Sequence, residues 1–455
     1  MATEVSFADH RRRLGRRRAF IGIAREYVGR SPEAGAIFGF VAVFLFFFFA
    51  TWANTGWPPQ ITTATSVLSV FNKATAHGII AVGVTMLMIS GEFDLSVGSI
   101  LGLSALFFII AASRGLGGLV EVLPGIDQAR VEQWGISYQG LPGIICILIA
   151  LAIGAFLGMI NGLLLITTRI PSFIVTLGTL YFYRSIMVSI IPGGTIARYT
   201  REPMVWYFHP LIIIGFCFLA VLTVAFFLWP SIQGSWMRLQ LAQQGNRKVG
   251  PILRLILIGL LLLAIFSLSV VISLGYTDRL DKLIGAPFFD ILNGQFAFTT
   301  ENFRSGTIWW FLIAIVFHFI LNNTRYGNAI FATGGNPQAA RAQGINVNRV
   351  KLSVFVLSGM LAATAGIMEA ARFKVVEPLR GTGYELDVIA ATVIGGTLLT
   401  GGYGSIIGSV LGVLIAFMLS TGLVLINVPA EWFRGILGLI MIGAVIINTN
   451  IRRQR

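Results

Sequence analysis

Charged residues are scarce in this chain of 455 residues. Asp, Glu, Lys and Arg make up 11% of the sequence, whereas 56% of the residues are hydrophobic and the mean hydropathy is +0.82. A soluble globular protein carries roughly a quarter of its residues as charges. So few charges cannot coat a soluble surface of this size, and the apolar content excludes a disordered or collagen-like chain. The composition therefore predicts an integral membrane protein.

Cysteine is nearly absent as well. The two cysteines, Cys146 and Cys217, lie in long apolar runs, where a thiol behaves as a small hydrophobe, so we expect no structural disulfide. His77, His209 and His318 are scattered and lack the spacing of a metal site. No Ser/His/Asp or Cys/His grouping indicates nucleophilic catalysis. We therefore expect neither catalytic residues nor a bound metal.

A phosphate-binding loop of the form G-x4-G-K-[ST] is also missing. The chain therefore cannot bind ATP in the P-loop manner, and we expect it to hold no cofactor of its own. If transport is driven by ATP, a separate subunit must supply the nucleotide site.

Apolar segments are abundant, and a helix needs about 20 such residues to cross a bilayer. Twelve segments, some of them short, predict an all-α polytopic helical bundle. The charged region before the first segment is too long for a signal peptide, so we treat that segment as an uncleaved span. The predicted segments are 34–53, 74–91, 95–113, 141–167, 172–191, 209–230, 253–275, 306–322, 350–371, 386–400, 404–426 and 432–449.

The basic residues predict an orientation. The net charge is +14, but Lys and Arg sit at the ends of apolar segments rather than on one surface, which indicates membrane orientation rather than nucleic-acid binding. Twelve crossings place both termini on one side, and that side receives most of the Lys and Arg residues. We therefore expect a cytoplasmic basic segment 1–33, a transmembrane domain 34–449 and a cytoplasmic tail 450–455.

One stretch recurs at an offset of 310 residues. Residues 91–102 read GEFDLSVGSILG and residues 401–412 read GGYGSIIGSVLG. Each copy predicts a helix, a glycine-broken turn and a second helix, as in the discontinuous helices of transporters built from repeats. Plain helical hairpins packed through glycine are the alternative. The coinciding small residues are Gly91 with Gly401, Gly98 with Gly408, Ser99 with Ser409 and Gly102 with Gly412.

Glycines one helical turn apart indicate close helix packing, because small residues let backbones approach. Whether this contact is made within one chain or between two stays open. The two sets are Gly154, Gly158 and Gly162, and Gly404, Gly408 and Gly412.

Two carboxylates stand in the first broken turn. Glu92 and Asp94 are costly near the hydrocarbon, so a proton or cation relay is one interpretation. The alternative is that Asp94, followed by Ser96, caps the next helix by accepting from its exposed N–H groups. The second copy carries Gly402 and Gly404 instead of the pair, which favours a structural role or a role confined to the first copy.

The stretch 325–345 predicts a short cytoplasmic helix with both ends marked. Gly335 precedes Asn336, a good N-cap, and Pro337 suits the first helical position. Gly344 suits a left-handed C-terminal position. A helix this short is unstable alone, so it either docks on a partner or ties two spans together. The predicted helix runs from Pro337 through Gln338, Ala339, Ala340 and Arg341 to Gln343, and Gly344 follows its end.

Four motifs in order resemble the monosaccharide (ribose/xylose) branch of ABC importer permeases, and most nearly the xylose-type permeases. They are residues 91–99, 170–178, 326–345 and 394–402. The resemblance implies a permease homodimer in a bacterial inner membrane, with two cytosolic ATPase subunits that bind ATP and Mg, and an external sugar-binding protein. It also implies that residues 335–344 form the helix that couples to the ATPase, within a coupling loop 323–349.

The resemblance also bears on the translocation path and on the length of the chain. Extra spans and loops at about 208–322 depart from the shorter sugar permeases and match the enlarged xylose type. The leading hypothesis is a sugar importer subunit, pentose-like, without an enzymatic site. The rival is a self-sufficient secondary transporter that couples to protons through Glu92 or Asp94. The signature residues that we expect to border the path are Glu92, Asp94, Ser96, Gly98, Gly395, Gly396 and Gly401.

Overall fold

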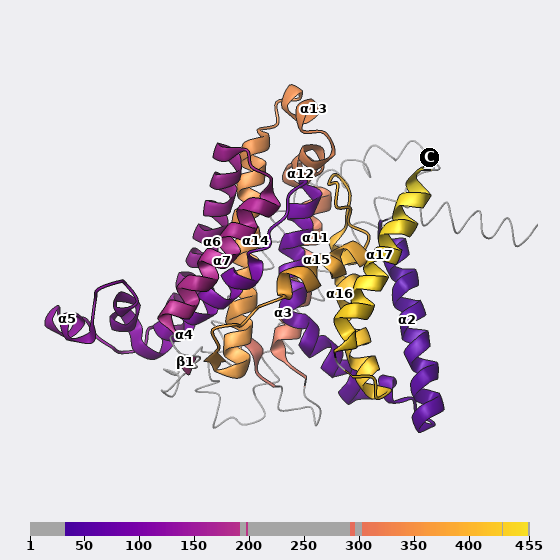
Figure 1. Ribbon diagram of the computed structural model, residues 1–455, viewed down its shortest axis with the longest axis horizontal. Coiled ribbons are helices and arrows are strands. Elements are labelled where there is room, and N and C mark those ends of the chain that lie inside the picture. The colour runs from indigo at the N-terminus through magenta and orange to yellow at the C-terminus, as the bar shows by residue number, and fades with distance from the viewer. Residues whose placement is uncertain (1–31, 192–196, 199–291, 296–302, 430, 454–455) are drawn as a thin grey trace, which may run out of the picture.

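The computed structural model describes residues 32–191, 197–198, 292–295, 303–429 and 431–453 (Figure 1). The Arg-rich start and the predicted spans 209–230 and 253–275 lie outside these residues, as do Cys217 and His209. Within the described residues the chain is almost entirely helical, with one two-stranded sheet. The predicted all-α class is confirmed.

Most helices agree with the predicted segments to within a few residues, although α3 begins at Ala64, well before its predicted start at residue 74. Among the helices of the described residues, eight are long and apolar enough to cross a membrane, and α17 adds a shorter apolar stretch, Trp432–Ala444. The chain is a multi-pass membrane protein. The long helices are α2 (Pro32–Thr55), α3 (Ala64–Ile89), α4 (Val97–Glu121), α6 (Gly143–Thr168), α7 (Ser172–Ile190), α11 (Ser305–Asn323), α14 (Val347–Phe373), α16 (Ile406–Leu425) and α17 (Trp432–Arg453). The short elements are η1 (Gln60–Thr62), α5 (Gln128–Gln133), α12 (Arg325–Gly335), α13 (Pro337–Ala342), α15 (Tyr384–Ile394), β1 (Ala197–Arg198) and β2 (Val375–Val376).

Helix α14 lies at the centre of the described bundle, where it packs against α3, α4 and α6. Helix α16 packs against α2, α3 and α15, and α17 contacts α15 and α16. One continuous apolar core joins these helices, with the large side chains of Phe108, Trp310 and Phe355 fully buried. Helices α12 and α13 project from one end of this bundle (Figure 1).

The glycines of α6 let its backbone touch that of α14. A Cβ at Gly154 would collide with the carbonyl oxygen of Gly359, and one at Gly158 would collide with that of Phe355. Gly162 lies against Leu352 in the same row. The first predicted small-residue contact is therefore made within one chain.

The predicted span 386–400 is wrong, because α15 has 11 residues and ends at Ile394. At 1.5 Å per residue it rises about 16 Å, roughly half the bilayer core. Gly396 has φ +94°, and the Thr397 N–H donates to the Thr392 carbonyl at 3.2 Å, so the helix ends in a Schellman-type turn. Gly404 lies in the loop that follows, so of the second glycine set only Gly408 and Gly412 stand on α16.

Helix α4 runs past its predicted end at residue 113. Gly115 has φ +59° inside it and bends the helix there. A Cβ at this position would collide with the carbonyl oxygen of Gln139, so the bend is also closely packed. The end of α4 and the following α5 project sideways from the bundle (Figure 1).

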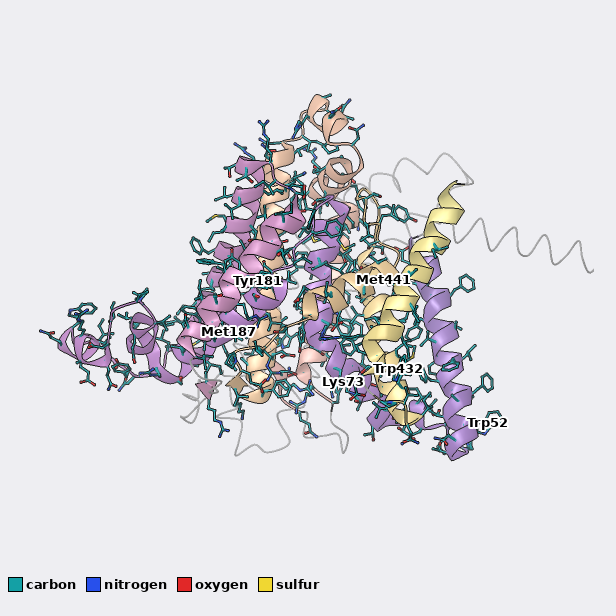
Figure 2. All side chains as sticks on the ribbon, in the orientation of Figure 1. Trp52, Lys73, Tyr181, Met187, Trp432 and Met441 are labelled. Carbon is teal, nitrogen blue, oxygen red and sulfur yellow. The ribbon has the colours of Figure 1, made fainter. Side chains whose placement is uncertain are left out.

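Exposed tryptophans mark the end of the bundle opposite α13. Trp52 of α2 and Trp432 of α17 lie at this end, on the outside of the helices (Figure 2). Their side chains are 48% and 63% exposed. Tryptophan is enriched where the membrane meets water. These two residues therefore indicate one boundary of the apolar layer, and α13 lies on the opposite side.

Candidate coupling and translocation site

The short helix predicted between 336 and 344 is present as α13. The Asn336 side-chain oxygen accepts from the N–H groups of Gln338 at 3.1 Å and Ala339 at 3.0 Å, and Pro337 takes the first helical position. Gly344 has φ +81° after the helix end. Both ends of α13 are therefore built as the sequence predicts.

Most of α13 is open to solvent. Gln338, Ala339 and Arg341 are exposed, whereas Ala340 is 4% exposed and packs inward. The helix thus presents a surface of small side chains and one guanidinium, and no carboxylate lies between 322 and 351. Such a surface fits a docking partner, and its role as a coupling helix remains a prediction.

A second loop helix, α12, precedes α13 and was not predicted. The Thr324 hydroxyl caps it by accepting from the Gly327 N–H at 3.1 Å. Its Tyr326 hydroxyl lies 2.7 Å from Ser353 of α14. Burial of the ring raises the pKa of Tyr326, so this hydroxyl stays protonated. The sequence analysis missed this helix because the segment contains three glycines, and glycine has low helix propensity.

The end of α12 meets both broken turns, backbone to backbone. A Cβ at Gly334 would collide with the carbonyl oxygen of Ile89, the last residue of α3. The Gly402 N–H donates to that same carbonyl at 2.8 Å. Gly401 lies against Gly91 so closely that a Cβ there would stand 2.8 Å from the Gly91 Cα. We call these five residues the glycine junction.

The two turns have related but unequal geometry. The Glu92 N–H donates to the Leu87 carbonyl at 3.1 Å, the same helix-ending bond that Thr397 makes. When the two copies are aligned on this hydrogen bond, Gly91 corresponds to Gly396 and not to Gly401. The shift arises because the connection from α15 to α16 is longer than the one from α3 to α4. After the turns, Gly98 and Gly408 both lie in the first turn of a helix and both pack on a carbonyl oxygen. The predicted helix, turn and helix are present in both copies.

The two carboxylates of the first turn have separate partners. Glu92 forms an ion pair with Lys351, near the start of α14. Asp94 is fully buried and accepts from the N–H of Ser96 at 2.8 Å and from its hydroxyl at 2.6 Å. Ser96 is the N-cap residue of α4, so Asp94 supports the helix start, although it does not reach the N–H groups within the helix.

Side chains of α6 and α7 tie the same turn to the bundle. Asn161 donates to the Ser96 hydroxyl at 2.8 Å, and the Tyr183 hydroxyl donates to Asn161 at 3.2 Å. Ser172 accepts from the Phe93 N–H at 3.0 Å, and Thr176 accepts from the Leu95 N–H at 3.1 Å. A cluster of buried polar side chains therefore holds the first broken turn in place. Asn161, Thr176 and Tyr183 belong to this cluster and have a structural role in it.

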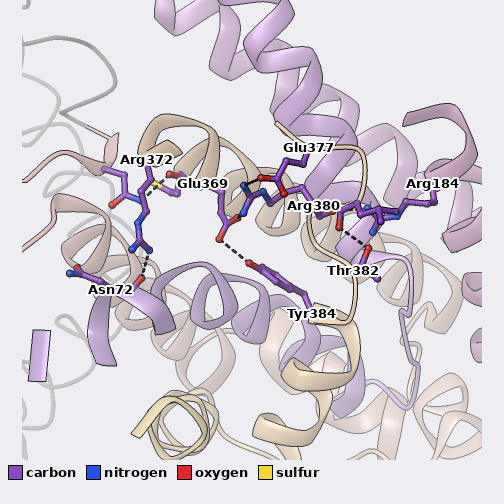
Figure 3. A network of polar contacts seen from close by, with 11 residues as sticks. Asn72, Arg184, Glu369, Arg372, Glu377, Arg380, Thr382 and Tyr384 are labelled. Carbon is purple, nitrogen blue, oxygen red and sulfur yellow. Dashed lines mark hydrogen bonds and ion pairs between the residues drawn. The ribbon is translucent and has the colours of Figure 1, made fainter. Parts of the chain in front are cut away.

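A polar network that the sequence analysis missed lies at the other end of α14 (Figure 3). Glu369 accepts from the Tyr384 hydroxyl at 3.1 Å and pairs with Arg380 at 3.5 Å. Arg184 of α7 donates to the Arg380 carbonyl at 2.6 Å, and Arg372 donates to the Asn72 carbonyl at 3.1 Å. A glutamate inside the predicted span 350–371 was the signal for it, since a carboxylate there needs a partner.

Helix α15 takes part in this network and in one further ion pair. The Tyr384 ring packs against that of His77 of α3 in a tilted arrangement, with ring centroids 3.9 Å apart. Asp387 pairs with Arg434 of α17 at 3.7 Å. Tyr384 and Asp387 of the half-length helix are thus partnered by α3, α14 and α17.

Comparison with known proteins identifies the family. A family model described as the permease component of branched-chain amino acid transport systems matches residues 66–445. The chain belongs to this permease family. The match spans α3 to α17, and therefore both broken turns, the glycine junction and α13.

Curated relatives agree with this assignment. The chain is 30% identical over 415 residues to the xylose transport system permease protein XylH of Escherichia coli, covering 91% of each chain. It is 27% identical to the ribose import permease protein RbsC of the same species, over 86% of this chain and 87% of the relative. It is 25% identical to the autoinducer 2 import system permease protein LsrC of Salmonella paratyphi B, over 94% and 92%. These names confirm the resemblance to the monosaccharide branch of ABC permeases. No solved structure matches the chain.

Proposed function

We propose that this chain is the membrane permease subunit of an ATP-driven importer that carries a monosaccharide, xylose or a similar pentose, across the bacterial inner membrane. The names of relatives that match over nine-tenths of the chain support the substrate class. The absence of a P-loop from the sequence supports a separate ATPase that binds ATP and Mg.

The observation that carries the coupling mechanism is the glycine junction. Helix α13 is exposed, and the helix before it ends directly on the backbones of both broken turns. Backbone contacts leave no flexible side chain to absorb a displacement. A cytosolic ATPase that moves α13 would therefore move the two turns together, and with them the starts of α4 and α16.

The complete transporter comprises two copies of this permease, two cytosolic ATPase subunits and an external sugar-binding protein, with both permease termini in the cytoplasm. Figure 1 supports this orientation, since the end of α17 lies toward the same end of the bundle as α13. The permease contributes the path and the coupling helix but no catalytic residue or cofactor.

The competing secondary transporter requires a titrating carboxylate. Glu92 is paired with Lys351, and Asp94 is engaged by Ser96 and Asn161. These partners account for both carboxylates in structural terms, so the observations favour the ATP-driven importer.

The deciding experiment reconstitutes the permease in liposomes with the ATPase that co-purifies from its native membrane and with the binding protein. We expect labelled xylose uptake that requires ATP and survives collapse of the proton gradient. Ala339→Asp, on the exposed face of α13, should abolish ATPase binding and uptake, while Ala339→Ser should retain both. Uptake by the permease alone that stops with the proton gradient would overturn the proposal.

A further inference from the structure

A cavity of about 610 Å³ opens beside α13. Its walls come from the end of α6, the connection between α6 and α7, the last turn of α13 and the first turn of α14. The charged residues that line it are Arg169, Arg341, Lys351 and Glu92. Two parts of the chain that are distant in the sequence, one with Arg169 and the other with Arg341 and Lys351, therefore bring their basic side chains to one cavity.

The charges in this cavity do not balance. Glu92 pairs with Lys351, which leaves the guanidinium groups of Arg169 and Arg341. Within the described residues, neither Arg169 nor Arg341 has an ion-pair or hydrogen-bond partner for its side chain, and both are exposed. Arg169 also stands just after the C-terminal end of α6, where the helix dipole stabilises a cation. The cavity thus carries two uncompensated positive charges.

The position of Arg341 indicates what would neutralise them. Arg341 belongs to α13, so anything that touches both guanidinium groups must lie against the face on which the ATPase is proposed to seat. Guanidinium groups bind carboxylates through paired N–H donors. A phospholipid headgroup would reach Arg169 from the plane of the membrane, but its binding would not require a contact with Arg341 on α13. An acidic group of the ATPase therefore fits the pair better.

We propose that the cavity is a receptor for an acidic side chain of the cytosolic ATPase, held jointly by Arg169 and Arg341. The inference rests on the proposed function, and it adds a second, distant segment, the connection between α6 and α7, to the docking surface. Because Glu92 and Lys351 form the adjoining wall, the seated carboxylate would lie beside the first broken turn as well as on α13.

Arg169 is the residue that tests the inference, because it is 172 positions away from Arg341 and outside the predicted coupling helix. The probe is the ATPase that co-purifies with the wild-type permease, with its affinity for the purified permease measured at low and high salt. We expect Arg169→Glu and Arg341→Glu each to weaken binding at least tenfold, and Arg169→Lys to weaken it less. The matched control is Arg349→Glu, an exposed arginine at the same end of the bundle that does not line the cavity, and it should bind like wild type.

A charge exchange completes the design. Changing each acidic residue of the ATPase surface in turn to Arg should reveal one substitution that restores binding to Arg169→Glu and weakens binding to both wild type and Arg349→Glu. If Arg169→Glu binds the ATPase as wild type does while Ala339→Asp does not, the cavity is no receptor and the proposed function stands. If Arg169→Glu instead loses co-purifying anionic phospholipid, the cavity binds a headgroup and the inference is overturned. If wild type binds no ATPase, the proposed function itself fails.

Discussion

The Gly402 N–H donates a 2.8 Å hydrogen bond to the carbonyl oxygen of Ile89. Ile89 is the last residue of α3, and Gly402 lies in the loop before α16, 313 positions later in the sequence. Gly334 packs against both from the end of α12. One carbonyl oxygen thus joins the two broken turns to the segment that carries α13.

Gly334→Ala should disrupt this junction. The added Cβ meets the Ile89 carbonyl, and overpacking of this kind costs about 1–3 kcal/mol or more. We expect a lower unfolding temperature in detergent and a loss of sugar-stimulated ATPase activity in the reconstituted complex. Gly335→Ala is the matched control, because its Cβ would meet only the Gly402 Cα at 3.9 Å. Equal behaviour of the two variants would contradict the role of the junction.

Gly158→Ala should separate α6 from α14. The new methyl group would strike the backbone of Phe355, whereas a methyl group at Gly178 of α7 has nothing within 4 Å. We expect Gly158→Ala to lower the free energy of unfolding by about 1–3 kcal/mol and Gly178→Ala to leave it unchanged or slightly raised. Denaturant titration of both variants in the same detergent is the measurement.

Asp94→Asn should act on stability rather than on energy coupling. The amide keeps an oxygen for Ser96 but loses the charge that strengthens those bonds, at a cost of about 1–3 kcal/mol. Asn161→Ala removes a hydrogen-bond donor from the same cluster without changing a titratable group, and it should lower the free energy of unfolding in the same way. Loss of uptake in Asp94→Asn alone, at unchanged stability, would point to proton coupling.

Glu369 and Arg380 should depend on one another. Their side chains are 10% and 17% exposed, so removing either charge leaves the other poorly solvated. We expect Glu369→Gln and Arg380→Gln each to destabilise the protein, and the double variant to be less destabilised than the sum by about 0.5–3 kcal/mol. A double-mutant cycle of unfolding free energies measures this, and strict additivity would rule the pair out as a stabilising contact.

Local signals in the sequence predicted the spans and the ends of α13, because apolar length, an Asn-Pro start and a terminal Gly act through neighbouring residues. They did not predict α12, whose stability comes from Thr324 and from contacts with α14. The pairing of Gly91 with Gly401 followed residue identity, whereas the helix-ending bonds pair Gly91 with Gly396. The ion-pair partners of Glu92 and Glu369, which are Lys351 and Arg380, could not be predicted. They are brought together by tertiary packing, and a single sequence does not reveal which distant residues come into contact.

The half-length helix α15 has a consequence for how the protein is made. With 11 residues and the carboxylates of Glu385 and Asp387, it is too short and too polar to be released into lipid as an independent span. Asp387 finds its partner in Arg434, which the ribosome adds 47 residues later. We therefore expect α15 to leave the translocation machinery only after α17 is synthesised, so that residues 384–453 enter the membrane as a unit.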